Sequence, residues 1–362
     1  MNRNKGLSRR DLLKAGLFSG GALSMASMLS FMEYRQADAQ ANGPLKAAFS
    51  SAGLAGSWNA QGQQAALAYG KLYGVDITWF DGQFDAVKQR AAVDDMATKK
   101  WDFVAIQPNT IGTLVDPITS MIQAGTPFID MDTLVAPLDQ MKSIGVLNLC
   151  APNNTFMSES VVTRMAAKMG GKGKIAHIGG QPGHTGAQAR QQGMMNILKL
   201  NPNITLVDDQ PGNWDIATAA SLAESFLNRF PDLNAIFADN DDMALSARQV
   251  VETAGVQDQV LIGGVDMMPP AIQAVAAGKL AGTARNPANR IHGWAVVIGA
   301  YAATVGLDQA RKDVPFFTLA DGPALFPDID NNPDLADTPW KLNNYGMSST
   351  DGQIYLESLF LL

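Results

Sequence analysis

Apolar and polar positions alternate in blocks along the first part of the chain, from Pro44 to about residue 149. Short apolar runs are each followed by a polar turn and then by a longer segment with the period of an amphipathic helix. Strands that are apolar without interruption are typical of parallel sheets that helices cover on both faces. The pattern therefore predicts a doubly wound α/β domain. Its predicted strands are 45–50, 75–80, 103–107 and 127–132, and its predicted helices are 61–73, 85–98 and 116–124.

The same alternation resumes after Cys150. The helix predicted over 215–230 carries its apolar residues at spacings of three and four, which gives it one apolar stripe. The fold class we predict is α/β, with two doubly wound parallel-sheet lobes joined by a hinge near residues 148–152. In this second part the predicted strands are 174–178, 204–207, 235–238, 260–265 and 280–284, and a further helix is 155–169.

These elements divide the chain into segments. We assign 45–149 plus 286–315 to lobe one and 150–285 to lobe two. From about residue 313 the sequence becomes rich in proline and then carries an acidic run. We interpret 316–362 as a third hinge crossing and a C-terminal tail that packs on a lobe.

The N-terminal residues have the layout of a twin-arginine export signal. Arg9 and Arg10 are followed by a weakly apolar run and then by Ala37-Asp38-Ala39, a small-x-small cleavage motif. The alternative is an N-terminal membrane anchor, but the apolar run over 17–31 is too short and too rich in serine and glycine to span a bilayer well. We therefore predict a signal peptide over 1–39, with cleavage after Ala39, and a mature protein outside the cytoplasm.

Composition excludes several classes of site. Hydrophobic residues make up 46% of the 362 residues, which indicates globular lobes, and the net charge of −7 without basic clusters argues against a nucleic-acid partner. The single cysteine, Cys150, rules out an internal disulfide, and it lies in an apolar run typical of a buried strand. The three histidines show no metal-ligand spacing. We predict no cofactor, no metal and a monomer.

Polar residues follow many of the predicted strands. Ligands of open parallel sheets bind beyond the carboxyl ends of the strands, so these residues are candidates for one pocket. Carboxylates accept hydrogen bonds from hydroxyl groups, amides and arginine donate to them, and an aromatic face packs on the C–H face of a sugar ring. The set therefore suits a neutral polyhydroxylated ligand. Its members are Ser50, Ser51, Asp81, Gln107, Asp132, Asn240, Asp241, Asp266 and Arg285, with Trp58 and Trp214 in loops just after strands.

Several segments carry a resemblance to a known family. The run from Ala235 to Leu245, an apolar strand followed by Asn240-Asp241 and then by Met-Ala-Leu, is the strongest of them. Gly263-Gly264-Val265-Asp266 and Gly278-Lys279-Leu280 follow in the expected order and spacing. From about residue 45 to 306 the chain resembles the periplasmic sugar-binding proteins of ABC importers, most of all the ribose-binding type.

The resemblance implies a set of ligand contacts. Asn240 and Asp266 have the family's residue types, and Asp132 matches its strand-end aspartate. Thr133 stands where the family commonly has an arginine, and our alignment places Gln188 where a second arginine is usual. Without these two arginines the pocket would lack two planar guanidinium groups that donate hydrogen bonds, which argues against ribose itself. Another pentose, a hexose or a linear polyol therefore stays open. The implied ligand-binding residues are Trp58, Gln107, Asp132, Gln188, Trp214, Asn240, Asp266 and Arg285.

The function that the resemblance implies is capture of a small sugar or polyol between the lobes in the periplasm, with hinge closure and docking on an ABC permease in the inner membrane. A sensor that presents its closed form to a chemoreceptor or a histidine kinase is an alternative. A third is an exported carbohydrate-active enzyme that uses Asp132 and Asp266 as an acid–base pair. A repressor of the related two-lobe type would need a DNA-binding head where this chain has a signal.

Some polar residues have plainer interpretations. Asp81 and Asp241 either contact the ligand or cap helices. We interpret the run over 239–242 as a ligand amide with helix-start carboxylates and not as a metal site. His184 is more typical of a surface loop than of a pocket.

Overall fold

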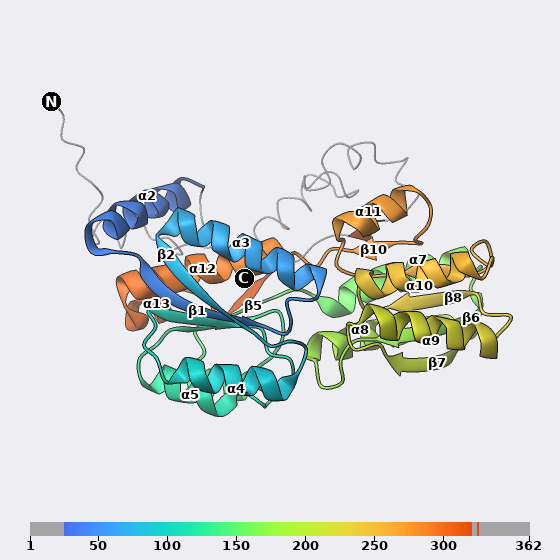
Figure 1. The fold of residues 1–362 in the computed structure, drawn as a ribbon, viewed down its shortest axis with the longest axis horizontal. Helices are drawn as coiled ribbons and strands as arrows, with labels where there is room; N and C mark the ends of the chain where they lie inside the picture. Colours follow the sequence, from blue (N-terminus) through green and yellow to red (C-terminus); the bar gives the residue numbers. More distant parts are fainter. Residues whose placement is uncertain (1–24, 321–323, 326–362) are drawn as a thin grey trace.

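The computed structural model describes residues 25–320 and 324–325, which form two α/β lobes arranged end to end (Figure 1). Lobe one is built on a six-stranded parallel sheet in the order β11-β5-β4-β3-β1-β2. The first four strands along the chain lie within one residue of their predicted bounds. The strands are β1 (Leu45–Ser51), β2 (Val75–Asp81), β3 (Phe103–Ile106), β4 (Phe128–Met131), β5 (Asn148–Ala151) and β11 (Phe317–Leu319).

Helices cover both faces of this sheet. Successive side chains of a strand point to opposite faces. Phe103 and Ala105 of β3 therefore pack in the cluster with α3 and α12, whereas Val104 and Ile106 pack with α4 and α5. This explains the uninterrupted apolar runs of the sequence. The helices of lobe one are α3 (Ser57–Tyr73), α4 (Ala86–Ala97), α5 (Val115–Gln123), α6 (Leu138–Ile144), α12 (Ala288–Val305) and α13 (Leu307–Asp313).

Helix α12 is the central helix of lobe one, and its residues are buried on nearly every side. A helix that is apolar all round has no amphipathic stripe, so the sequence pattern gave no prediction for it. Gly299 lets it approach the sheet closely, because a Cβ at this position would lie 2.1 Å from the ring of Phe103.

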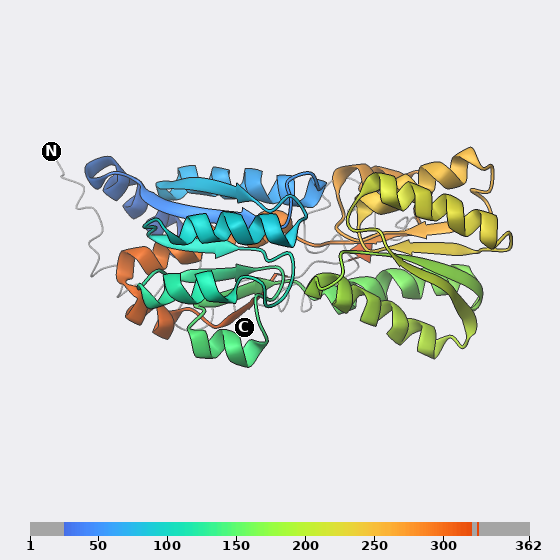
Figure 2. The same cartoon turned by 60° about the horizontal axis from the view of Figure 1, so that its bottom comes forward.

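Lobe two repeats the architecture with a four-stranded parallel sheet in the order β7-β6-β8-β9. Strand β10 lies next to β9 through isolated bridges and pairs antiparallel with β12. One face packs against α7 and α8, and the other against α9, α10 and α11 (Figure 2). The strands are β6 (Lys172–Gly179), β7 (Asn203–Pro211), β8 (Ala235–Ala238), β9 (Leu261–Gly263), β10 (Thr283–Ala284) and β12 (Ala324–Leu325). The helices are α7 (Asn154–Lys168), α8 (Thr185–Leu200), α9 (Ile216–Arg229), α10 (Asp241–Thr253) and α11 (Pro269–Ala276).

The boundaries between the lobes differ slightly from the predicted ones. Cys150 and Ala151 belong to β5, so they extend lobe one past residue 149. Strand β11 pairs with β5, which places the start of the segment predicted as a third crossing in lobe one. The crossing follows β11 and leads to β12 in lobe two. The predicted tail beyond Leu325 lies outside the described residues.

Helix α2 (Met25–Asn42) precedes β1 and lies at the end of lobe one that is remote from lobe two (Figure 1). It contains the later part of the predicted signal peptide, whereas residues 1–24 lie outside the part of the chain that the structure describes. Among the described residues, none of the helices combines the length and the apolarity that crossing a membrane requires.

Candidate functional site

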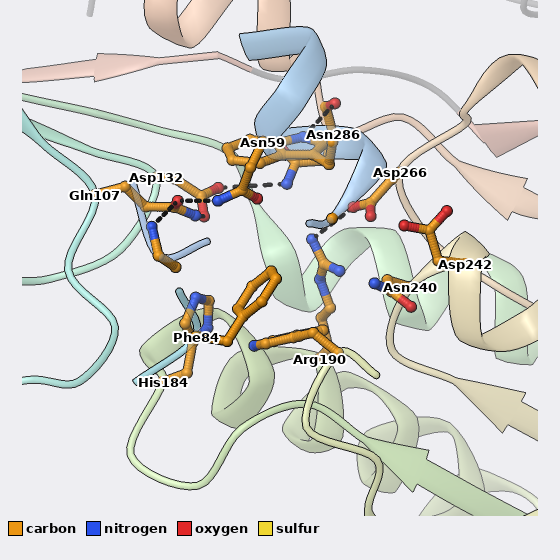
Figure 3. A pocket seen from close by; sticks show the side chains of 14 residues that line it. Asn59, Phe84, Gln107, Asp132, His184, Arg190, Asn240, Asp242, Asp266 and Asn286 are labelled. Atoms are coloured by element: carbon orange, nitrogen blue, oxygen red, sulfur yellow. Dashed lines mark hydrogen bonds and ion pairs between the residues drawn. The ribbon is translucent and has the colours of Figure 1, made fainter. Parts of the chain in front are cut away.

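A pocket lies between the two lobes at the carboxyl ends of both sheets, and its side chains converge from the two sides (Figure 3). In lobe one the strand order reverses between β1 and β3, and in lobe two between β6 and β8. Such reversals open a crevice in which ligands of α/β proteins bind. The lining residues are Ala52, Gly56, Trp58, Asn59, Phe84, Gln107, Asp132, His184, Arg190, Trp214, Asn240, Asp242, Asp266 and Asn286.

The structure brings most of the predicted ligand-binding residues together in this pocket, namely Trp58, Gln107, Asp132, Trp214, Asn240 and Asp266. It does not bring Gln188 or Arg285 there. Gln188 is exposed on α8 and lines a separate hollow of lobe two beside His177. Arg285 is half-buried at an isolated bridge with Asp266, and its neighbour Asn286 lines the pocket instead.

Arg190 takes the place in the pocket that the sequence alignment gave to Gln188. Residues two apart on an α-helix are rotated by about 200°, so they face opposite sides. An alignment that is shifted by two residues therefore selects the outward face of α8. Arg190 is part of the motif on which the alignment was based. However, the sequence does not show which face of α8 is turned toward the pocket, because this depends on contacts with other elements.

The Arg190 side chain is 4% exposed and is held by partners on three elements. Its Nε donates to Oδ1 of Asn154 at 2.9 Å, its Nη2 donates to Oδ1 of Asp266 at 3.1 Å, and its Nη1 donates to the carbonyl oxygen of Asp239. Because the guanidinium is planar and its donors are fixed, these bonds set its orientation before a ligand arrives. The pocket thus contains one preorganised cation between carboxylates of the two lobes (Figure 3).

Lobe one contributes an amide network around Asp132. Gln107 Nε2 donates to Oδ2 of Asp132 at 2.9 Å. The Gln107 Oε1 accepts from Nδ2 of Asn59 at 2.9 Å and from the backbone N–H of Ala52 at 3.1 Å. Asn59 was not predicted, because it lies in the first turn of α3, which begins four residues before the predicted helix. The same extension places Trp58 on α3 and not in a loop, with its Nε1 donating to the carbonyl oxygen of Asn286 at 3.0 Å.

Two aromatic residues occupy equivalent positions in the two lobes. Phe84 follows β2 in the sequence Gly82-Gln83-Phe84-Asp85, and Trp214 follows β7 in the sequence Gly212-Asn213-Trp214-Asp215. In each case the two central residues have positive φ, and the aspartate caps the next helix through backbone N–H groups. The internal repeat of these four positions was the sequence signal that could have identified Phe84.

His184 is buried in the pocket, which corrects its interpretation as a surface-loop residue. It caps α8 by accepting at Nδ1 from the backbone N–H of Ala187 at 3.3 Å, and its ring meets Trp214 edge-on at 5.0 Å. Burial, with the nearby charge of Arg190, lowers the pKa of His184 to about 3. The imidazole is therefore neutral across the physiological range and helps to position the Trp214 ring.

Asp81 and Asp241 brace loops, and neither is a helix cap or a pocket residue. Asp81 Oδ1 accepts from the N–H groups of Leu54 and Gln83 at 2.9 and 3.0 Å. Asp241 accepts from the N–H of Met268 at 2.8 Å and from the hydroxyl of Thr283 at 2.7 Å, which ties together the segments around β9 and β10. The caps of the adjacent helices are Asp85 and Asn240.

Two buried aspartates of the pocket, Asp132 and Asp266, have raised pKa values. Burial raises the pKa of Asp266 to about 7, with Arg190 opposing the shift and Asp242 and Asp132 adding to it. Burial also raises the pKa of Asp132, against the effects of Arg190 and Gln107. A hydroxyl group that donates to either carboxylate would favour its charged form.

The stability of the ligand-free protein should therefore depend on pH through Asp266. Because its folded pKa lies above its ordinary value of 3.8, the folded state binds more protons between about pH 4 and 7. This contribution to the free energy of unfolding is present at low pH and is lost as the pH rises to 7. Urea denaturation across this range should show a flatter dependence for Asp266→Asn than for the wild type, and parallel curves would contradict the assignment.

The lobes also contact each other directly around the pocket. Asp242, at the start of α10, accepts from the backbone N–H of Ser57 at 2.9 Å and from its hydroxyl at 2.8 Å, across the gap between the lobes. The N–H of Leu134 donates to the hydroxyl of Thr185 at 2.9 Å. The N–H of Ile111 donates to the carbonyl oxygen of Gly183 at 3.2 Å. The conformation described is therefore one in which the lobes are closed on each other.

Comparison with known proteins finds relatives that are all named as solute-binding proteins. The D-allose-binding periplasmic protein of Escherichia coli K12 is 30% identical over 219 residues, which cover 59% of this chain and 70% of that protein. A xylitol-binding protein of Mycolicibacterium smegmatis is 25% identical over 63% of each chain. Among solved structures, an ABC transporter periplasmic solute binding protein from Actinobacillus succinogenes 130z with bound D-allose has a TM-score of 0.71 at 25% identity, covering 80% of this chain and 99% of that one.

The sequence profile of the periplasmic binding protein domain matches residues 47–307, the range that holds nearly all of both lobes and every residue of the pocket. The ribose import binding protein of Bacillus subtilis, 28% identical over 59% of this chain and 67% of its own length, points to the same group. With its two parallel-sheet lobes and the pocket between them, the chain belongs to the periplasmic binding protein family and is of the ribose-binding type.

Proposed function

We propose that this protein is the periplasmic solute-binding component of an ABC importer and that it captures a small neutral sugar or polyol between its lobes. The observation that carries the proposal is the pocket itself, where carboxylates, amides, one arginine and aromatic rings converge from both lobes. Twin-arginine export would deliver the folded chain to the periplasm, and the closed form would deliver the ligand to an inner-membrane permease. The relatives named for D-allose, xylitol and ribose support this class of ligand.

The recognition chemistry follows from the groups present. Asp132 and Asp266 accept hydrogen bonds from ligand hydroxyls, while Arg190 and the amide of Asn240 donate to ligand oxygens. The oxygen of Asn240 is engaged by the N–H of Met243, so its amide nitrogen is the group left for the ligand. Trp214 offers an apolar face, and its buried Nε1 has no hydrogen-bond partner among the described residues. A ring or chain with hydroxyls on its edge and C–H groups on its face would pair with these acceptors and donors and pack on this apolar face.

Hinge closure is the mechanism that we propose for capture. The ligand touches both lobes, so it binds the closed form more tightly and shifts the population toward it. The Ser57–Asp242 contact belongs only to the closed form, because it joins the lobes, and it sets part of the closing equilibrium.

Weakening this contact should open the ligand-free protein. Ser57→Ala removes the hydroxyl donor without removing a pocket residue, and Asp242→Ala removes both bonds. We expect the larger loss for Asp242→Ala, at least about tenfold in affinity, because hydrogen bonds to charged groups contribute roughly 1.5–3 kcal/mol. Small-angle scattering should show a larger radius of gyration without ligand, and calorimetry should show the weaker binding. Unchanged scattering and affinity in both variants would rule out a role in closure.

Trp214 should contribute to ligand affinity through the face of its ring and through its N–H group. Two variants test these contributions. Trp214→Ala removes both and should weaken binding by roughly 1–3 kcal/mol. Trp214→Phe keeps an aromatic face of smaller area and removes the donor, so its loss should be smaller than that of Trp214→Ala. Calorimetric titration with the identified ligand measures both, and equal wild-type affinity in Trp214→Ala would show that the ring is not a stacking platform.

A thermal-shift screen against pentoses, hexoses and sugar alcohols tests the proposal. A ligand in large excess over its dissociation constant should add a few kcal/mol of stability and raise the melting temperature visibly. Recovery of the ligand unchanged after long incubation distinguishes capture from the alternative of carbohydrate hydrolysis. A screen in which no sugar or polyol raises the melting temperature would overturn the proposal.

A further inference from the structure

One face of helix α2 is built into lobe one, although the sequence motif assigned most of this helix to a removable signal. Phe31 and Arg35, one helical turn apart, are 0% and 1% exposed. The Phe31 ring packs against Tyr73 at 5.6 Å and edge-on against Tyr301 at 5.8 Å. It thereby joins the main apolar cluster of lobe one, between the end of α3 and the central helix α12.

Arg35 completes the C-terminal end of α3. Its Nε and Nη2 donate to the carbonyl oxygens of Tyr73 and Gly74 at 3.3 and 3.4 Å, and its Nη1 pairs with Asp38 at 2.5 Å. Cationic side chains at a helix C-terminus bind otherwise unpaired carbonyls and interact favourably with the helix dipole.

Ala39 continues the same face one turn later. Gly74 ends α3 in the left-handed conformation, with φ of 60°, and a Cβ on it would lie 2.5 Å from the Cβ of Ala39. The backbone of α2 therefore approaches α3 closely at the residue where the small-x-small motif predicted cleavage. The N–H of Gly43 bonds to the carbonyl oxygen of Ala39, which continues this arrangement toward β1.

We propose that the segment from Phe31 to Asn42 is retained in the exported protein as a structural helix of lobe one, and that the signal is removed N-terminal to Phe31. This rests on the export that is part of the proposed function. Ser24-Met25-Ala26 supplies a small-x-small motif upstream of the buried face. A membrane signal peptidase would hydrolyse the Ala26–Ser27 peptide bond, with water adding hydroxide to the Ala26 carbonyl carbon and a proton to the Ser27 nitrogen.

Cleavage after Ala39 would instead remove Phe31 and Arg35. It would expose the faces of Tyr73 and Tyr301 and leave the last carbonyls of α3 without their cation. Burial of large apolar groups is the main stabilising contribution to folding, so loss of the segment should destabilise lobe one.

The first experiment is intact-mass measurement and N-terminal sequencing of the protein from a periplasmic fraction. We expect Ser27 as the first residue, and any start from Met25 to Phe31 supports the proposal. A start at Gln40 or later, or an unprocessed chain, overturns it. If the protein stays in the cytoplasm, the export in the proposed function has failed, and this result is distinct from a wrong cleavage position.

The second experiment compares the full-length wild type with Phe31→Ala, Arg35→Ala and the exposed control Gln36→Ala, all purified from the periplasm. The first two variants should melt lower by at least about 4 °C, and the control should melt like the wild type. Ligand affinity should be the same in all four, because α2 lies at the end of lobe one that is remote from lobe two (Figure 1), whereas the pocket lies between the lobes. Identical masses and melting temperatures in all four would show that the segment is absent from the mature protein.

Discussion

Replacing Arg190 with methionine is expected to abolish ligand binding, with a loss of at least about 100-fold in affinity. Arg190 is the lining residue whose donors are already fixed, by Asn154, Asp239 and Asp266. Hydrogen bonds from a guanidinium are about twice as strong as those between neutral groups, and the loss leaves Asp266 without its cation. Methionine keeps most of the hydrocarbon volume, so the packing of α8 is largely preserved. Calorimetry with the ligand from the screen measures the change.

The matched control is Gln188→Ala, two residues away on the same helix. Gln188 is exposed and lines a different hollow, so its variant should bind like the wild type. Loss of binding in Gln188→Ala with retention in Arg190→Met would restore the sequence alignment and contradict the structure. Breaking a buried ion pair costs about 3–5 kcal/mol of stability, so circular dichroism must confirm that the Arg190→Met protein is folded. Arg190→Lys, which keeps the charge, provides a milder variant if it is not.

Asp266→Ala should also abolish binding. Asp266 lies in the segment just after β9 with a φ of 115°, and its carboxylate is in the pocket against Arg190. The alanine variant loses the acceptor for ligand hydroxyls and one of the three partners that orient Arg190. The expected loss is again at least about 100-fold, because each hydrogen bond to a charged group contributes roughly 1.5–3 kcal/mol. Titration calorimetry is the readout, with the exposed Asp258→Ala in the same lobe as the control.

The Arg190 and Asp266 variants should not be additive. Since the two side chains form one buried pair, the double variant Arg190→Met/Asp266→Ala should lose little more affinity than either single variant. Additive losses would show that each residue contacts the ligand independently of the other. Wild-type affinity in Asp266→Ala alone would remove the residue from the site.

The strands were predictable because their signal is local. A continuous apolar run such as Phe103–Ile106 is required wherever helices cover both faces of a sheet, whatever the rest of the chain does. The strand-end rule then placed Gln107, Asp132, Asn240 and Asp266 in one crevice without any knowledge of distances. Helix α12 was not predictable in this way, because a helix buried on all sides carries no periodic stripe.

The other pocket residues could not be predicted in this way, because their positions depend on how helices and loops are oriented in the fold. Which of Gln188 and Arg190 faces the ligand is a matter of helix rotation, which is set by what α8 packs against. His184 entered the pocket because the loop after β6 turns inward against Trp214, and no local pattern encodes that turn. Phe84 had a signal, the repeat of the Trp214 turn in the other lobe, but the repeat is only four residues long.

The sequence by itself determined the fold class and the two lobes and pointed to the class of ligand that we propose, because apolar periodicity and strand-end chemistry are properties of neighbouring residues. Only the tertiary structure decided which arginine serves the pocket, which contacts join the lobes, and that Phe31 and Arg35 of the apparent signal pack into lobe one. Each of these depends on side chains from segments far apart in the chain, whose proximity is fixed by packing and not by local order.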